Sequence, residues 1–199
     1  MPVMKDKIIC LAVAVVLSGC ASTAKSTGTL YFPQAFNEMR TVLVVPFENL
    51  TPFPEAGLIV ADLLAEELRV WEGYDIRDRH AVDQIARTGG QPLPINWNRA
   101  EALRFARLLN ADAVVYGTLI EFGYLREHRG LTEMATFGAV VRVADARSGR
   151  ILWEATLNGS GGGTLTAGRP PLMDVSSAAI QEGLEDLFGT LFAWREAGG

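Results

Sequence analysis

The first twenty residues set the frame for the rest of the chain. Two lysines precede an apolar run from Ile8 to Leu17, and small residues follow it. That order is typical of a secretory signal, with a cationic start, an apolar centre and small residues before the cleavage point. A membrane-spanning helix needs roughly 20 apolar residues, and this run has about half that number. We therefore expect residues 1–19 to be a signal peptide that is removed.

The end of that segment, Leu17-Ser18-Gly19-Cys20, resembles the lipobox of bacterial lipoproteins. The resemblance implies cleavage after Gly19 and a diacylglycerol with an amide-linked chain such as palmitate on Cys20. Buried acyl chains contribute about 0.8 kcal/mol per methylene, so two or more chains hold a protein firmly at a membrane. Ala21 stands where an Asp would favour the inner membrane, which implies the outer membrane and its periplasmic face.

Cysteine usage limits how the core is held together. Cys10 is lost with the signal and Cys20 would carry lipid, so the remaining 179 residues have no cysteine for an internal disulfide. Packing must stabilise the core, although disulfides are common in oxidising compartments. That length suits one domain.

Charge argues against nucleic acid as a partner. The chain carries −5, and the signal contributes +1 through Lys5, Asp6 and Lys7, so −6 remains after cleavage. Binding to phosphate backbones needs clusters of Lys and Arg, and no basic run is present.

The segment from Cys20 to Arg40 is rich in Ser, Thr and Gly and lacks a helical or strand period, so we expect a flexible tether over residues 20–40. A periplasmic domain then spans residues 41–199. It opens with an apolar strand, Thr41–Phe47, in which Pro46 can only lie at the end. A helix is predicted from about Glu55 and a short strand over Tyr74–Asp78.

The second half alternates further helices and strands. Asp78 and Asn98 are predicted N-caps of helices over Arg79–Arg87 and Arg99–Leu109, on either side of an irregular segment, 88–97. A long strand, Ala113–Tyr124, is expected to place Val114, Tyr116, Thr118, Ile120 and Phe122 on one face. The chain then continues with strands over Met134–Val143 and Ile151–Leu157, which a turn at Asp145–Gly149 connects. It ends with a flexible loop at Gly159–Gly163 and a last helix that has an apolar stripe. The predicted fold is a single α/β domain, with a mixed sheet, a C-terminal three-strand meander and helices packed on it.

Three stretches together resemble the CsgG-like family of envelope lipoproteins. They are VLVVPFENLT from Val42, ADAVVYGT from Ala111, and DARSGRILW from Asp145. The family includes the curli-secretion lipoprotein, LpoB-like activators of penicillin-binding proteins and PelC-like lipoproteins of exopolysaccharide export. The resemblance covers residues 41–195 and implies a CsgG/LpoB-like periplasmic domain that works through protein contacts, with a homo-oligomeric ring in the PelC-like case.

Departures from the family favour the PelC-like pattern. Membrane-spanning strands come in hairpin pairs of about 9 to 11 alternating residues, and no extra hairpin is present. The loop Leu125–Glu133 carries Arg126 and His128, whose side chains would be energetically costly to place in the bilayer. The tether is short for an LpoB-like activator. The favoured function is therefore a non-enzymatic accessory factor in the export of a polymer or protein, and the alternative is an activator of a peptidoglycan synthase.

The inventory for catalysis is small. His80 and His128 are the only histidines, no Cys or His spacing predicts a metal site, and Gly159–Gly163 lacks the Lys that phosphate loops carry. We expect no cofactor and no metal. A lipid-tethered enzyme or small-ligand-binding protein with a pocket beside the Pro92–Trp97 loop stays open as a further alternative.

Aromatic residues are the candidates for contacts with envelope partners. Trp97 lies in an irregular segment, Trp194 near the end of the last helix, and Phe188 and Phe192 on its apolar stripe. Aromatic side chains dominate the energetics of protein interfaces. Trp153, by contrast, is expected in the core.

Overall fold

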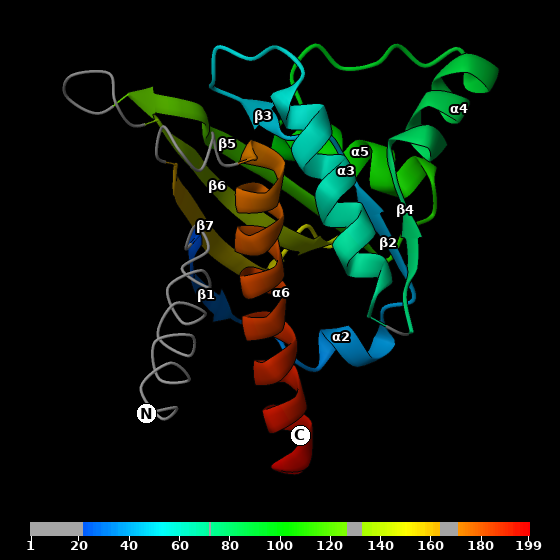
Figure 1. Cartoon of the computed structure of the whole chain (residues 1–199). Helices are drawn as coiled ribbons and strands as arrows, with labels where there is room; N and C mark the ends of the chain where they lie inside the picture. Colours follow the sequence, from blue (N-terminus) through cyan, green and yellow to red (C-terminus); the bar gives the residue numbers. More distant parts are fainter. Residues whose placement is uncertain (1–21, 72, 127–132, 164–170) are drawn as a thin grey trace, which may run out of the picture.

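The computed structural model describes residues 22–71, 73–126, 133–163 and 171–199. Within these ranges one mixed sheet runs in the order β1-β7-β6-β5-β2-β4, and β3 pairs with β5 (Figure 1). The strands are β1 (Ser22–Leu30), β2 (Thr41–Val44), β3 (Glu48–Asn49), β4 (Asp75–Arg77), β5 (Ala113–Arg126), β6 (Glu133–Asp145) and β7 (Ile151–Gly163). The helices are α2 (Ala35–Glu38), α3 (Ala56–Arg69), α4 (Arg79–Gly89), α5 (Arg99–Leu108) and α6 (Leu172–Glu196).

The sheet combines a parallel and an antiparallel half. Strand β2 lies parallel to both β4 and β5, and β3 is also parallel to β5. Strands β5, β6 and β7 form an antiparallel meander. The predicted single α/β domain with a mixed sheet and a C-terminal meander is thus confirmed.

Helices cover both faces of the sheet. On one face, α3 and α6 pack on a large core that includes Leu64, Trp153 and Leu184 (Figure 1). On the other face, α4 and α5 enclose a smaller core around Val82 and Phe105. Trp153 is 2% exposed, which confirms its predicted core position.

Local signals in the sequence correctly placed two helix starts. The Asp78 side chain accepts the N–H of His80 at 2.9 Å, and the Asn98 side chain accepts the N–H of Glu101 at 3.1 Å. Each bond satisfies one donor that a helix start leaves free. The turn before β7 also forms as expected, because Gly149 takes a φ of 73° that suits glycine.

The expected tether over residues 20–40 is wrong within its described part. Ser22–Leu30 forms edge strand β1, paired with β7 along its whole length, and Ala35–Glu38 forms α2. Thr23, Lys25, Thr27 and Thr29 are exposed, and the intervening residues are half-buried. The period of two is present but hidden, because the inward residues Ala24, Ser26 and Gly28 are small.

The expected face of the long strand is partly wrong. A register shift between Leu119 and Glu121 indicates a bulge in β5. Tyr116 consequently packs on the α5 side while Phe122 packs on the α3 and α6 side. A bulge inserts one residue and moves the following side chains to the other face.

The expected flexible loop at Gly159–Gly163 is the end of β7, paired with both β1 and β6. At Gly159, a Cβ atom would stand 2.8 Å from the carbonyl oxygen of Val175 on α6. The glycine therefore permits close packing of the helix on the strand.

The predicted signal peptide, Cys20 and His128 lie outside the described residues. Among the described helices, none combines the length and hydropathy that crossing a bilayer requires.

Candidate functional site

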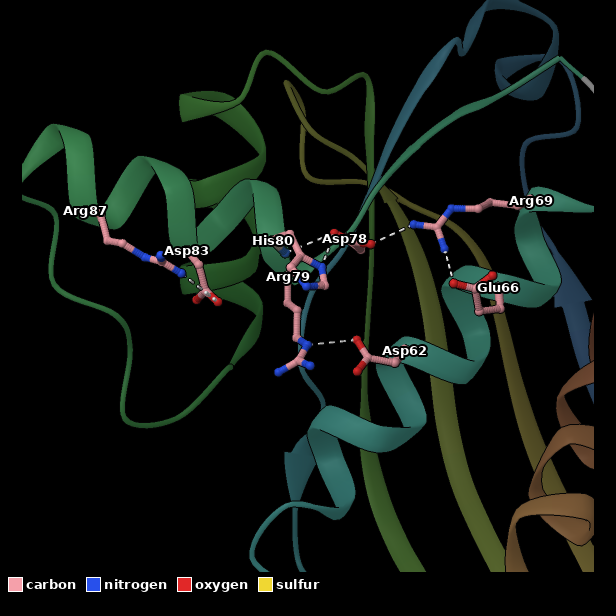
Figure 2. A network of polar contacts seen from close by, with 8 residues as sticks. All are labelled: Asp62, Glu66, Arg69, Asp78, Arg79, His80, Asp83 and Arg87. Atoms are coloured by element: carbon pink, nitrogen blue, oxygen red, sulfur yellow. Dashed lines mark hydrogen bonds and ion pairs between the residues drawn. The ribbon is translucent and has the colours of Figure 1, made fainter.

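An ion-pair network links α3 to the start of α4 (Figure 2). Arg69 bonds Glu66 and Asp78 at 2.6 Å each, and Arg79 lies 3.1 Å from Asp62 as an ion pair without hydrogen-bond alignment. Since α3 and α4 pack on opposite faces of the sheet, the network ties the two layers together beside edge strand β4.

Asp78 is the centre of this network. Partial burial works to raise the pKa of its carboxyl, but bonds from Arg69 and from the backbone and ring of His80 outweigh that effect and hold the pKa below its usual value. His80 is exposed and its Nδ1 lies 3.2 Å from Asp78. The arrangement positions α4. The outer pairs, such as Arg87 with Asp83 at 3.9 Å, are exposed and contribute little stability.

The positioned α4 forms one wall of an open groove of about 580 Å³. Arg79 and Asp83 line that wall, and the loop that contains Leu93, Ile95 and Trp97 lines the opposite one. Ile95 is 99% exposed. This is the pocket expected beside the Pro92–Trp97 loop. Its walls combine apolar side chains, such as Leu93 and Ile95, with polar ones from α4, a mixture found in sites that bind a ligand or a partner.

Trp97 is held in place in this groove. Its ring centroid lies 5.1 Å from that of Phe105 in a tilted arrangement, and the side chain is half-buried. The contact leaves part of the indole facing the groove, as an aromatic anchor at an interface requires.

A second, aromatic groove of about 500 Å³ lies where α3 ends against α6. Trp71 stacks on Phe188 at 4.1 Å between centroids, and Phe192 lies 6.3 Å from Trp71. Arg40 and Arg195 also line the groove. No sequence pattern pointed to Trp71, because it follows α3 in a segment without helical or strand periodicity.

The four aromatic interaction candidates therefore lie in different settings. Phe188 is buried at 6%, whereas Phe192 is 51% exposed in the aromatic groove. Trp194 is half-buried, and Gly199 packs on its indole. A Cβ atom at position 199 would clash with the indole ring. Trp97 and Phe192 line open grooves with partly exposed rings, whereas Phe188 lines the aromatic groove as a buried ring.

The described residues contain no cluster of three or more His, Cys, Asp or Glu side chains that could hold a metal ion. The candidate sites of the described domain are thus two open grooves, each lined by apolar or aromatic side chains together with charged ones.

The fold matches solved structures of bacterial lipoproteins. The PelC dodecamer from Paraburkholderia phytofirmans is 25% identical, with a TM-score of 0.57, over 84% of this chain and 97% of that one. The lipoprotein GNA1162 from Neisseria meningitidis is 21% identical, with a TM-score of 0.52, over 75% and 99%. The predicted resemblance to the lipoprotein family that includes PelC is thereby confirmed.

No protein-family model matches the sequence. No curated protein matches it either. The likeness therefore rests on structure.

Proposed function

We propose that this chain is a non-catalytic, lipid-anchored accessory protein of a cell-envelope machine, acting as a homo-oligomer in the export of a polymer or protein. The observation that carries the proposal is the likeness to the PelC dodecamer over 97% of that chain. A match over nearly the whole of a small domain includes the surfaces with which its subunits could meet, although function does not follow from fold alone.

The exposed apolar side chains support a role in protein contacts. Leu93 and Ile95 are 50% and 99% exposed beside one groove, and Val70 and Phe192 are 74% and 51% exposed beside the other. Apolar side chains gathered at grooves indicate surfaces that a partner covers. In a PelC-like export assembly, such surfaces would contact neighbouring subunits or partner proteins.

The long-reach activator alternative loses support from the position of β1. A chain that is folded into the sheet from Ser22 onward has almost no linker with which to cross the periplasm after an anchor at Cys20. No observation favours the enzyme alternative.

Multi-angle light scattering tests the oligomer. A soluble form that begins at Ala21, compared with the full chain in detergent, is expected to give a single mass of several subunits. Ile95→Asp and Phe192→Asp then identify which groove lies at the subunit contact. A strict monomer for both forms at high protein concentration would refute the assembly.

Membrane fractionation tests the anchor separately. Cys20→Ser is expected to move the protein from the outer-membrane fraction to the soluble periplasmic fraction, because the acyl chains would be lost. Cys10→Ser is the matched control and should leave the protein in the membrane. Retention of a Cys20→Ser variant whose mass shows that residues 1–19 have been removed would exclude lipidation as the source of attachment.

A further inference from the structure

A small hollow lies on the α5 side of the sheet, next to the groove that Trp97 lines. Its volume is about 360 Å³, and Tyr116, Thr118 and Arg142 of β5 and β6 line it together with Asn98 and Arg99 at the start of α5. Backbone N–H groups and the dipole at a helix start favour a negative charge.

Tyr116 is the unusual residue of this hollow. It is 5% exposed, and its hydroxyl has no hydrogen-bond partner among the described residues. Buried polar groups are almost always bonded, and one left alone is costly. The side chain lines the hollow, and its hydroxyl, which is buried behind that surface, has an unused donor.

The charges of two arginines act on that hydroxyl. Burial raises the pKa of Tyr116, the charges of Arg99 and Arg142 oppose the rise, and the charge of Glu154 adds to it. Arg99 donates one bond to the carbonyl of Gly149 at 2.6 Å, and Arg142 pairs with Glu154. Both retain further N–H donors, since a guanidinium has five.

The charged side chains of the lining leave one net positive charge, and Arg142 is also paired with Glu154 outside the lining. Glu48 is the only acidic side chain that lines the hollow itself, against Arg99 and Arg142. Its Oε2 accepts a bond from Thr118 at 3.3 Å. A bound group would meet mainly donors, with Glu48 available to accept a bond from an N–H beside that group.

The hollow and the larger groove adjoin, because Glu48 and Trp97 line both. A ligand can therefore place a charged end in the hollow and an apolar body along Leu93 and Ile95. A peptide that ends in a free carboxylate has this layout, with a terminal anion, an adjacent amide N–H and side chains that point away.

We infer that the hollow binds the C-terminal carboxylate of a partner protein, whose last apolar residues lie in the groove beside Trp97. The carboxylate accepts bonds from the Tyr116 hydroxyl and from the free N–H groups of Arg99 and Arg142. Capture of a chain terminus by donors is a known recognition mode. The inference does not depend on the lipid anchor or on the oligomer, and it adds a partner site to the proposed function.

Fluorescence anisotropy on the full chain in detergent tests this site with dansyl-labelled tetrapeptides. The probes are Gly-Ala-Val-Leu, Gly-Ala-Leu-Ile and Gly-Ala-Leu-Phe, each as the free acid and as the C-terminal amide. At least one free acid is expected to bind with a Kd below roughly 1 mM, and its amide about tenfold more weakly, because a bond to a charged acceptor is lost. Equal binding of acid and amide, or no binding by any acid, would overturn the inference.

Tyr116→Phe is the decisive variant. It removes an unbonded hydroxyl without changing the packed volume, so stability is expected to stay the same or rise, while affinity for the free acid falls about tenfold. Tyr124→Phe is the matched control on the opposite face, where the hydroxyl accepts the N–H of Leu172 at 3.2 Å. It should reduce stability and leave binding unchanged. Unchanged affinity in Tyr116→Phe refutes the site.

A competition arm distinguishes a peptide end from an acidic sugar. N-acetyl-leucine should displace the dansyl peptide at a lower concentration than glucuronate, since only the former has an apolar side chain for the groove. Displacement by glucuronate at the lower concentration would assign the hollow to a carboxylated sugar and overturn the peptide assignment.

Discussion

The carboxylate of Asp112 accepts the backbone N–H of Thr41 at 2.9 Å, across 71 positions of sequence. The same oxygen accepts the N–H of Arg40, also at 2.9 Å. These bonds join the start of β2 to the segment before β5, where two parallel strands begin side by side. The bonds from Thr41 and Arg40 also hold the pKa of the Asp112 carboxyl below its usual value.

Removing that carboxylate should weaken the parallel half of the sheet. For Asp112→Ala we expect the free energy of unfolding to fall by about 1.5 to 3 kcal/mol at pH 7, the usual contribution of bonds to a charged group. Urea denaturation measures it. Glu182→Ala, an exposed change on α6, is the control and should have little effect.

The same variant predicts a pH dependence. The pKa of Asp112 is lower in the folded state than in the unfolded state, where it is about 3.9. The carboxylate therefore contributes its full stabilisation above the unfolded-state pKa, and this stabilisation is lost as pH falls through the folded-state pKa. The stability difference between wild type and Asp112→Ala should therefore be constant from pH 7 to 5 and shrink below pH 4. A difference that grows on acidification would contradict this origin.

Gly57, near the start of α3, packs against the segment between β2 and β3. A Cβ atom there would stand 2.3 Å from the carbonyl oxygen of Phe47, which is backbone and cannot rotate away. Gly57→Ala is expected to destabilise the fold by about 1 to 3 kcal/mol through overpacking. Gly189→Ala on α6, where nothing lies within 4 Å, should stabilise it by up to about 1 kcal/mol. Thermal unfolding of the pair separates steric conflict from helix propensity.

Phe188 and Phe192 are one helical turn apart but should respond differently to truncation. Phe188→Ala removes a buried ring stacked on Trp71 and should cost about 3 to 5 kcal/mol. Phe192→Ala removes a ring that is half exposed and should cost less than about 1.5 kcal/mol. Equal costs would mean that Phe192 is structural and not a contact residue.

Strand β1 gives the sharpest test of whether residues 22–30 belong to the domain. A soluble form that begins at Tyr31 exposes the edge of β7 and should melt well below the form that begins at Ala21. A tether could be removed without effect, so equal melting temperatures would restore the tether interpretation.

The parts of the fold that the sequence predicted are those with a local physical signal. Asp78 and Asn98 marked helix starts because a short polar side chain can bond a free N–H nearby. A continuous apolar run marked β2, and the apolar residues of α6 had the helical period. Each of these signals needs only a few neighbouring residues.

The parts that failed depend on contacts distant in sequence. On the inward side of β1, a Cβ atom at Gly28 would lie 3.0 Å from Trp153 Nε1 and 3.2 Å from Ala155. Small residues are needed there, and the alternation of large apolar and polar residues that predicts a strand is therefore missing. Gly159 lies in β7, and it is a glycine because α6 packs so closely on the strand that a Cβ atom has no room. The hollow at Tyr116 was also hidden, because a tyrosine within an apolar strand suggests core and only the fold brings Arg99 beside it.

The position of β1 has a consequence for how copies of the protein meet. Only Ala21 separates Cys20 from Ser22, and these two steps along the chain reach at most about 7 Å. If Cys20 carries lipid, each domain is confined to a thin layer and presents the same end of its sheet to the bilayer. Copies then meet in two dimensions with their tilt largely fixed, which raises their effective concentration and lowers the orientational entropy that assembly must overcome. The same side contacts should therefore join lipid-anchored domains more firmly than they join the soluble form.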